Sequence, residues 1–345
     1  MAVSEAPLLA AAARRPAPVT PIWFMRQAGR YMPEYRALRE RHTLLELCAQ
    51  PELITEVTLQ PVRALGVDAA ILFADILLPL VPMGLDLGFV AGEGPAIANP
   101  VRTAHDIASL RAVDPEADLG AVLSGIRILS GELPPHVPLI GFVGGPFTVG
   151  TYAVEGGPAR QALEAKRMMH AAPELWHALM QKLTVALGDF LVAQVRAGAR
   201  VVQLFDSWAG LLDAHDYRTH ALPYSRAVLE RVADLGVPRI HFGVGASHLL
   251  PAMRETGAEV LGLDWRTSLD EGWASVGPDR AVQGNLDPAA LFAPLPELRR
   301  RVDRILERAA GRDGHIFNLG HGILPGTPVD HVRAVVDYVH ERTAG

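Results

Sequence analysis

Short and almost continuously hydrophobic segments recur along the chain, and each of them ends in glycine, aspartate or another polar residue. Such segments are typical of strands that are buried on both faces, as the strands of a parallel sheet are. Eight of them can be counted, at residues 22–25, 69–74, 139–143, 201–205, 240–242, 260–263, 281–283 and 316–319.

Amphipathic stretches with helical spacing lie between these segments. The clearest of them predict helices over residues 52–65, 172–196, 217–235 and 295–310. Glycine is the residue that most often ends a helix. Three glycines stand just beyond the first three of these stretches, namely Gly66, Gly198 and Gly236.

Eight strands that alternate with helices predict an α/β fold, a single (β/α)₈ TIM barrel. A doubly wound open sheet is the structural alternative. No change of composition and no long linker divides residues 21–345, so we expect one domain there, with a long loop over residues 78–100. Residues 1–20 are rich in alanine and proline, and we expect them to form a disordered tail.

The overall charge and hydropathy limit the partners of this protein. A formal net charge of −6 argues against a general nucleic-acid-binding protein, which needs a broad basic surface. An anionic substrate must then be met by locally concentrated arginines. There is no apolar run of about 18 residues, as a membrane-spanning helix requires, and the N-terminal segment lacks the charge order of a secretory signal. We therefore expect a cytoplasmic protein with no membrane partner.

Cysteine and lysine are scarce, which removes several kinds of chemistry. Cys48 is the only cysteine, so an internal disulfide and a thiolate-rich zinc or iron–sulfur site are excluded. The only lysines, Lys166 and Lys182, lie in patterns typical of exposed helices. A Schiff-base or pyridoxal phosphate mechanism therefore lacks a suitable lysine.

Two arginines follow the first predicted strand, and active sites of barrels are built where the strands end. Arg26 and Arg30 are four residues apart, so a helical turn would place both guanidinium groups on one side. Such a pair suits carboxylates or phosphates, because each guanidinium can bind an oxyanion with two hydrogen bonds. The alternative is a pair of surface arginines bridged to Glu34 or Glu40.

A lone acidic residue, Asp75, closes the second predicted strand among Phe73, Ile76 and Leu77. A carboxylate in such apolar surroundings is costly unless it has partners, which makes Asp75 a candidate catalytic group. The alternative is an aspartate that caps a following helix. Other polar candidates near strand ends are Tyr152, Ser207 and His321.

Two glycine-rich segments are weaker signals. Residues 144–150 could surround a phosphate but lack the lysine of a P-loop, and residues 243–248 have His248 where a dinucleotide-binding loop has its third glycine. The histidines at 241, 248, 315 and 321 do not have the spacing of metal ligands, so we predict no metal site.

Several segments resemble the uroporphyrinogen decarboxylase family, and they occur in the family's order from residue 21 to the C-terminal helix. The most distinctive is residues 21–31, followed by Pro33-Glu34-Tyr35-Arg36. One departure is Ala74, where many members carry serine. The other matching segments are residues 75–77, 145–148, 152–157, 203–207, 283–288 and 318–323.

The resemblance implies a (β/α)₈ barrel, usually a homodimer, without metal or organic cofactor. It also implies removal of the four acetate carboxyls of uroporphyrinogen III, which gives coproporphyrinogen III. By position, the substrate-binding segment is Arg26, Gln27, Ala28, Gly29 and Arg30. The aspartate that binds the pyrrole nitrogens is Asp75, and the remaining polar contacts are Tyr152, Ser207 and His321.

The sequence does not identify the group that donates the proton to the pyrrole. Arg26 is the candidate that the resemblance suggests, but arginine hardly deprotonates. His321, or Tyr152 acting through water, is the chemically easier donor.

The sequence leaves two other functions open. One is a corrinoid-dependent methyltransferase. That group of enzymes looks like a relative of this family with the same barrel, but its members need zinc held by histidine and cysteine. Here Gly243 stands where a cysteine would have to follow His241, and Cys48 is far away in sequence. The other alternative is a non-catalytic tetrapyrrole-binding protein, against which the complete set of polar residues at strand ends argues.

Overall fold

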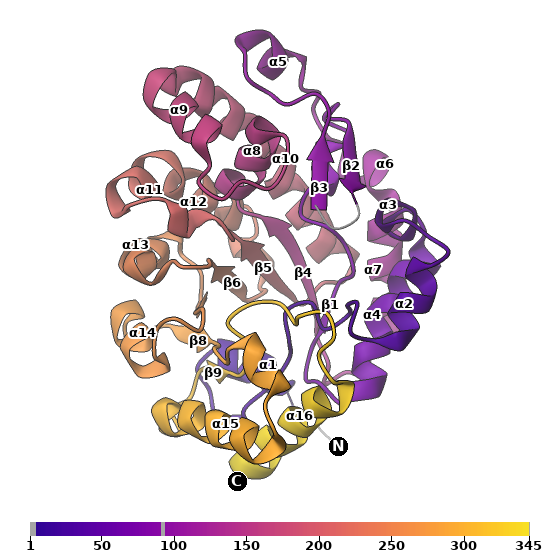
Figure 1. The fold of residues 1–345 in the computed structure, drawn as a ribbon, viewed down its shortest axis with the longest axis vertical. Coiled ribbons are helices and arrows are strands. Elements are labelled where there is room, and N and C mark those ends of the chain that lie inside the picture. Colours follow the sequence, from indigo (N-terminus) through magenta and orange to yellow (C-terminus); the bar gives the residue numbers. More distant parts are fainter. Residues whose placement is uncertain (1–4, 91–93, 345) are drawn as a thin grey trace.

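A parallel sheet of seven strands forms the centre of the computed structural model, which describes residues 5–90 and 94–344 (Figure 1). The strands follow one another in chain order, apart from a hairpin inserted after β1. A doubly wound sheet reverses its strand order at a switch point, so that alternative is wrong. The strands are β1 (Ala70–Ile71), β4 (Leu139–Gly144), β5 (Val201–Phe205), β6 (Arg239–Phe242), β7 (Val260–Gly262), β8 (Ala281–Gln283) and β9 (His315–Ile316).

The sheet is curled, because side chains from distant strands meet on its inner face. Trp23 Nε1 donates to Gln283 Oε1 at 3.0 Å, and Gln283 Nε2 donates to Gln203 Oε1 at 3.2 Å. All three residues are buried. Since β5 and β8 stand three places apart in the sheet, their side chains can bond only across a concave surface.

The first predicted strand is reduced to one bridge residue. Ile22 pairs in parallel with Phe317, just after β9, and its carbonyl accepts from Asp68 N–H at 2.8 Å, just before β1. The pairing stops there because the side chain of Asn318 accepts the N–H of Met25 at 3.1 Å, in place of a backbone carbonyl. Seven of the eight predicted strands are thus confirmed, and the first is corrected.

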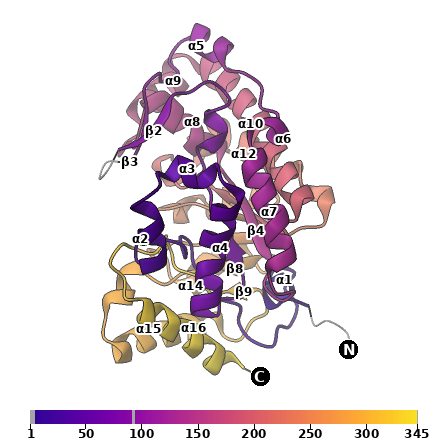
Figure 2. The same cartoon turned by 90° about the vertical axis from the view of Figure 1, so that its right-hand side faces the viewer.

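An outer layer of helices covers the convex side of the sheet (Figures 1 and 2). The predicted end of the first of them at Gly66 is confirmed, since this glycine has the left-handed φ of 71° that favours glycine. These helices are α4 (Pro51–Leu65), α7 (Gly120–Glu132), α10 (Pro173–Ala197), α12 (Leu222–Glu230), α13 (Leu250–Met253), α14 (Leu269–Val276), α15 (Leu295–Ala309) and α16 (Val329–Thr343).

The single helix predicted over residues 217–235 is divided in three. It comprises the end of α11 (Ala214–His220), then α12, then a 3₁₀ turn, η3 (Ala233–Leu235). Pro223 explains the first break, because proline has no N–H to continue the ladder and is tolerated only in the first turn of a helix.

Shorter elements lie mainly in the connections. The predicted loop over residues 78–100 contains an antiparallel hairpin, β2 (Leu87–Val90) and β3 (Gly94–Ile97), so it is partly structured. The others are α2 (Pro33–Arg39), α3 (Leu44–Cys48), η1 (Leu78–Leu80), α5 (Ala104–Ser109), α6 (Pro115–Asp118), α8 (Pro146–Glu155), α9 (Leu163–Ala171), η2 (Ala209–Leu211), η4 (Ser247–Leu249), η5 (Arg254–Thr256) and η6 (Pro288–Phe292).

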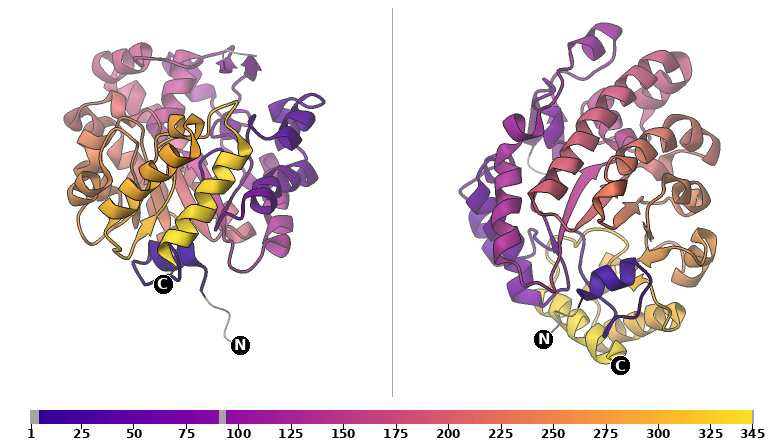
Figure 3. Two further views of the ribbon diagram at one scale, coloured as in Figure 1. Left: turned by 60° about the horizontal axis from the view of Figure 1, so that its bottom comes forward. Right: turned by 180° about the vertical axis from the view of Figure 1, so that it is seen from behind.

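The N-terminal segment is ordered where disorder was predicted. Helix α1 (Pro7–Ala12) packs beside β8 and β9 with Leu8 fully buried (Figure 3). Arg14 fixes the following turn by donating to the Pro278 carbonyl at 2.9 Å. The alanine-rich composition that suggested a tail provides a small apolar helix that covers the amino ends of these strands. The expectation of disorder is therefore wrong for residues 5–20, and residues 1–4 lie outside the described part.

Helix α10 has the length and hydropathy of a membrane-spanning helix, but it is a core helix of the fold. Of its most apolar window, 56% is buried inside the structure. The helix packs on β4, and Gln194 fixes it there by accepting from Phe142 N–H at 2.8 Å and donating to Phe142 O at 2.9 Å.

Candidate active site

Polar residues gather at the carboxyl edge of the sheet, where all seven parallel strands end. Burial is the largest influence on the pKa values of Asp75, Tyr152 and His321, and the positive charge of Arg26 acts on all three. These four predicted residues therefore lie within electrostatic reach of one another. We call the predicted site residues the rim: Arg26, Gln27, Ala28, Gly29, Arg30, Asp75, Tyr152, Ser207 and His321.

Asp75 stands four residues beyond β1 and is half-buried. Its Oδ1 accepts from Leu77 N–H at 2.8 Å, which shapes the turn into η1. The N-cap of η1 is Leu77, and the helix has no side-chain cap, so the capping alternative is wrong. The second oxygen, Oδ2, bonds to no described residue. Burial raises the pKa of Asp75, and the Leu77 N–H and the charge of Arg26 act against this rise. The carboxylate keeps one oxygen available.

Arg26 begins the first rim loop with a backbone conformation that is rare outside glycine, at φ 59°. Its side-chain stem lies against Gly322, where an added Cβ would come within 2.4 Å of Arg26 Cδ. A glycine is needed at this position for the two segments to touch. The contact brings Arg26 beside His321 from the other end of the chain.

Neither arginine of the pair is neutralised by a residue that the structure describes. Among the described residues no carboxylate forms an ion pair with Arg26 or Arg30, so the alternative of bridges to Glu34 or Glu40 is wrong. The predicted helical turn is also absent, since residues 26–32 form turns and bends before α2 begins at Pro33. Two exposed guanidinium groups therefore stand at the rim with their charges free.

Gln27 is used to hold the loop in place. Its side chain is fully buried, where Oε1 accepts from Phe24 N–H at 3.1 Å and Nε2 donates to Ala69 O at 3.0 Å. The next residues are more open. The backbone N–H groups of Ala28 and Gly29 donate to no acceptor in the described part of the chain, so they are free to bind an anion.

Tyr152 lies on a helix, because the glycine-rich segment 144–150 leads directly into α8 and is not a phosphate-binding loop. Its ring stacks on Trp208, with centroids 4.0 Å apart and an interplanar angle of 24°. Burial and the negative charge of Asp75 raise the pKa of Tyr152 to about 12, against the influence of Arg26. Ser207, next to Trp208, is half-buried. These residues form an aromatic wall with two hydroxyl groups.

His321 is flanked by two glycines that allow close packing on both sides. An added Cβ on Gly320 would come within 2.2 Å of the Trp265 backbone nitrogen. Burial lowers the pKa of His321, Arg26 and Arg266 lower it further, and Gly322 and Asp264 oppose them. The imidazole is thus favoured in its neutral form at neutral pH.

Sequence reasoning placed Asp206 at the end of the fourth predicted strand but gave this carboxylate no role. Asp206 is fully buried, accepts from Thr148 Oγ1 at 2.8 Å and from Ser225 Oγ at 3.3 Å, and lies 3.8 Å from His241 Nε2. Thr148 Oγ1 also accepts from Trp208 N–H at 3.1 Å. This network positions the aromatic wall. The signal was available, since an aspartate that directly follows a buried strand is the pattern that identified Asp75.

A second carboxylate, after the end of β7, was not identified from the sequence, although it follows a buried strand in the same way. Asp264 follows the strand, is buried, and forms an ion pair with Arg266 at 2.8 Å. The Arg266 guanidinium lies 3.9 Å from the ring centroid of Trp265, and that ring contacts His321 edge-on at 6.2 Å. A third arginine therefore stands next to the rim.

The zinc site of the methyltransferase alternative is not formed. His241 faces Asp206, while Cys48 is buried on α3, where burial and the charge of Asp75 raise the pKa of its thiol to about 12. A protonated thiol is a poor zinc ligand. Within residues 5–90 and 94–344, the one cluster of possible metal ligands contains no cysteine and lies outside the rim.

Solved structures confirm an α/β fold of this kind. A methyltransferase from Methanosarcina mazei is 21% identical and superposes with a TM-score of 0.75 over 97% of both chains. A B12-independent methionine synthase from Shewanella sp. W3-18-1 is 9% identical, with a TM-score of 0.59 over 87% of this chain and 90% of that one. At these identities the likeness concerns the fold alone.

Relatives that are similar in sequence show the family as well as the fold. A uroporphyrinogen decarboxylase from Roseiflexus sp. (strain RS-1) is 53% identical over 97% of this chain and 98% of its own length. One from Sorangium cellulosum (strain So ce56) is 56% identical over 96% and 95%. The family model for uroporphyrinogen decarboxylase (URO-D) matches residues 4–342. The chain therefore belongs to the uroporphyrinogen decarboxylase family.

Proposed function

We propose that this chain is a carboxy-lyase that removes the four acetate carboxyls of uroporphyrinogen III and so produces coproporphyrinogen III for tetrapyrrole biosynthesis. The observation that carries the proposal is Asp75, a half-buried carboxylate with one oxygen free and an unpaired arginine within electrostatic reach. Relatives that bear this name are 50–56% identical over nearly the whole chain, which supports the same activity here.

Asp75 would act on the centre of the substrate. The four pyrrole N–H groups of the macrocycle are donors, and an ionised carboxylate is an acceptor only. Loss of CO₂ from an acetate needs a place for two electrons, and protonation of the pyrrole creates a cation that accepts them. The negative charge of Asp75 stabilises this cation more than the neutral substrate, and only such differential binding speeds the reaction.

The arginines and the first rim loop would hold the edge of the macrocycle. Arg26 and Arg30 have no carboxylate partner in the described part of the protein, so each can bind a substrate carboxylate without breaking an ion pair. The free N–H groups of Ala28 and Gly29 add donors to the same loop. Gln27 contributes by fixing the loop, since its own side chain is fully bonded.

Tyr152, Ser207 and His321 complete the site in this proposal. Tyr152 stays protonated, because its pKa is raised to about 12, and it can donate a hydrogen bond or relay a proton through water. His321 is favoured in the neutral form, so it would donate from its ring N–H or take part as an imidazolium only at lower pH. The aromatic ring of Trp208 gives the macrocycle an apolar face.

The wider organisation belongs to the same proposal. We infer that residues 21–345 form one catalytic domain and that the sheet closes as a (β/α)₈ barrel, with the segment around Ile22 as its eighth strand. The hydrogen bonds of this segment to both Phe317 and Asp68 support the closure. The chain acts in the cytoplasm. As the family resemblance implies, it is a homodimer whose catalysis needs no metal or organic cofactor.

One experiment tests the activity directly. The protein is incubated anaerobically with uroporphyrinogen III, and the carboxyl groups of the products are counted by chromatography. We expect stepwise conversion from eight carboxyls to four. Binding without conversion would overturn the proposal in favour of a non-catalytic tetrapyrrole-binding protein, and methyl transfer to or from a corrinoid would overturn it in favour of the methyltransferase.

A further inference from the structure

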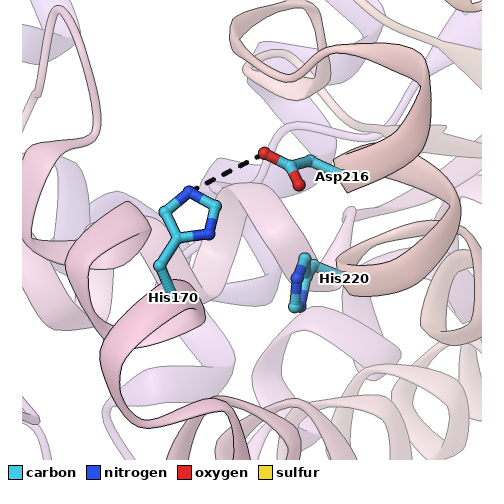
Figure 4. A group of neighbouring side chains, drawn as sticks. All are labelled: His170, Asp216 and His220. Atoms are coloured by element: carbon cyan, nitrogen blue, oxygen red, sulfur yellow. Dashed lines mark ion pairs between the residues drawn. The ribbon is translucent and has the colours of Figure 1, made fainter.

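Three side chains converge on the outside of the fold, where α9 meets α11 (Figure 4). His170 lies near the end of α9, and Asp216 and His220 lie four residues apart on α11, which places them on one side of that helix. Each offers one ligand atom, and the three atoms lie within 4.8 Å of one another. His170 Nε2 and Asp216 Oδ2 are 3.8 Å apart.

Apart from the pair of His170 and Asp216, the polar side-chain atoms of the three residues have no hydrogen-bond partner among the described residues. Neither ring nitrogen of His220 hydrogen-bonds to a described residue, and the same holds for the Asp216 carboxylate. His220 is only 8% exposed, and its Nδ1 is buried without a partner. Buried polar atoms are nearly always bonded, so an orphaned one needs a ligand that the protein does not itself supply.

The surroundings hold His220 still. Trp176 Nε1 donates to the His220 carbonyl at 3.0 Å. The ring of His177 stacks on that of His220 at 5.7 Å and an angle of 20°, and His177 is itself hydrogen-bonded to Tyr224. Burial lowers the pKa of His220, against the raising effect of Asp216, and so favours the neutral imidazole that binds metal.

We propose that His170, Asp216 and His220 form a binding site for a divalent transition-metal ion of the zinc class. Two imidazole nitrogens and one carboxylate oxygen are ligands that zinc accepts, with bonds of about 2.0–2.2 Å, and water fills the open position. Tetrahedral geometry then requires ligand atoms about 3.3–3.6 Å apart. The exposed side chain of His170 can supply the small inward movement that this spacing needs.

The ion would clamp α9 to α11. These helices flank the connection from β5, which carries Ser207 and Trp208 to the rim, and Lys166 of α9 already donates to Leu211 O in that connection at 2.6 Å. A metal bridge would reinforce this link. The site does not include the rim residues, so the clamp concerns stability and is independent of the proposed decarboxylation.

The test uses the full-length, untagged protein after removal of metals with a chelator. Equilibrium dialysis against zinc measures the bound equivalents and the affinity, and cobalt absorption spectra report the coordination. The variants are His170→Ala, which changes an exposed side chain, and Asp216→Asn, which keeps the shape. His215→Ala is the matched control, since His215 is an exposed histidine on the same helix outside the cluster.

We expect one zinc per chain in the wild type and in His215→Ala, with the affinity at least about 100-fold weaker in the two cluster variants, because even the loss of an outer partner of a ligand costs about 10–100-fold. Zinc should also raise the melting temperature of the wild type and not that of His170→Ala. Equal affinity in all four proteins, or an affinity too weak to saturate at about 1 mM zinc, would overturn the proposal. If zinc binds that weakly, His170 and Asp216 form only an ion pair that depends on the protonation of His170.

Discussion

The two edges of the central sheet differ in how completely their charged residues are paired. At the amino edge, Asp68 accepts from Ile22 N–H at 2.7 Å and from His340 Nε2 at 2.8 Å, and Arg239 forms an ion pair with Glu259. At the carboxyl edge, Arg26 forms no such pair among the described residues, and Asp75 bonds with one oxygen only. Asp264 and Arg266 do form an ion pair at the carboxyl edge, but Arg26 and one oxygen of Asp75 are left without a partner among the described residues.

This difference separates stability from function. A half-buried charge without a partner costs free energy, which the fold recovers when a ligand supplies the partner. A paired charge at the other edge fixes the strands and has nothing left to offer a ligand. The predictions below change one edge at a time, and each should affect one property and spare the other.

The largest effect is expected from Asp75→Asn. The change keeps the shape but removes the negative charge that stabilises the pyrrole cation, so kcat should fall by about 100-fold or more. Steady-state kinetics with uroporphyrinogen III measure it. A near-normal kcat would contradict the assigned role of Asp75.

The same variant should not lose stability. A carboxyl group whose pKa is raised in the folded state adds least to stability when it is ionised, so the penalty grows as pH rises from the unfolded pKa through the folded one. The asparagine side chain of the variant cannot ionise and escapes this penalty. Urea unfolding at pH 7 should therefore give the variant a free energy of unfolding equal to or above that of the wild type.

Arg26→Gln should reduce kcat/KM by about 10–100-fold, since a charge-assisted hydrogen bond contributes about 1.5–3 kcal/mol. The loss of its positive charge should also let the pKa of Asp75 rise further. The control is Arg254→Gln at the amino edge, which breaks an ion pair with Asp279 and should leave kcat/KM unchanged. Equal losses in both variants would end the distinction between the edges.

Asp68→Asn should have the reverse phenotype, with normal activity per folded molecule and a free energy of unfolding lower by about 1–3 kcal/mol. Asp68 raises the pKa of His340, first through their hydrogen bond. The stabilisation is therefore complete below the ordinary histidine pKa of about 6.5 and is lost as pH rises through the raised value. Urea unfolding at pH 6 and pH 9 checks this, and an equal loss at both would contradict an ionic contribution.

Local patterns predicted most of the fold. Continuous apolar segments identified seven strands, and Gly66 ended its helix as expected, because both signals lie within a few residues of the feature they predict. The reduction of the first strand at Ile22 was beyond such patterns, since it depends on an amide from Asn318 at the far end of the chain. The order of the N-terminal segment likewise depends on its packing against β8 and β9.

In the candidate site, too, local patterns identified some residues, while contacts between distant segments could not be predicted. Position after a strand was enough to find Asp75, and consistent use of that rule would also have found Asp206 and Asp264. No local signal indicates that Arg26 lies against Gly322, because that contact joins two distant loops. The proposed metal site gives no local signal, because His170 and His220 lie on different helices and meet only in the folded chain.

The smallest expected effect is a shift in the pKa of His321, caused by the positive charges at the carboxyl edge. His321 should titrate below the ordinary histidine value of about 6.5, because burial and then the charges of Arg26 and Arg266 lower its pKa. Removing one charge in Arg266→Gln should shift the midpoint upward, and high salt should reduce this shift, since Arg266 is half exposed and its charge is screened. NMR titration of His321 in both proteins at low and high salt measures the two effects. An unchanged midpoint would mean that the arginines next to His321 do not set its charge state, and the contrast between the two edges would then rest on hydrogen bonding alone.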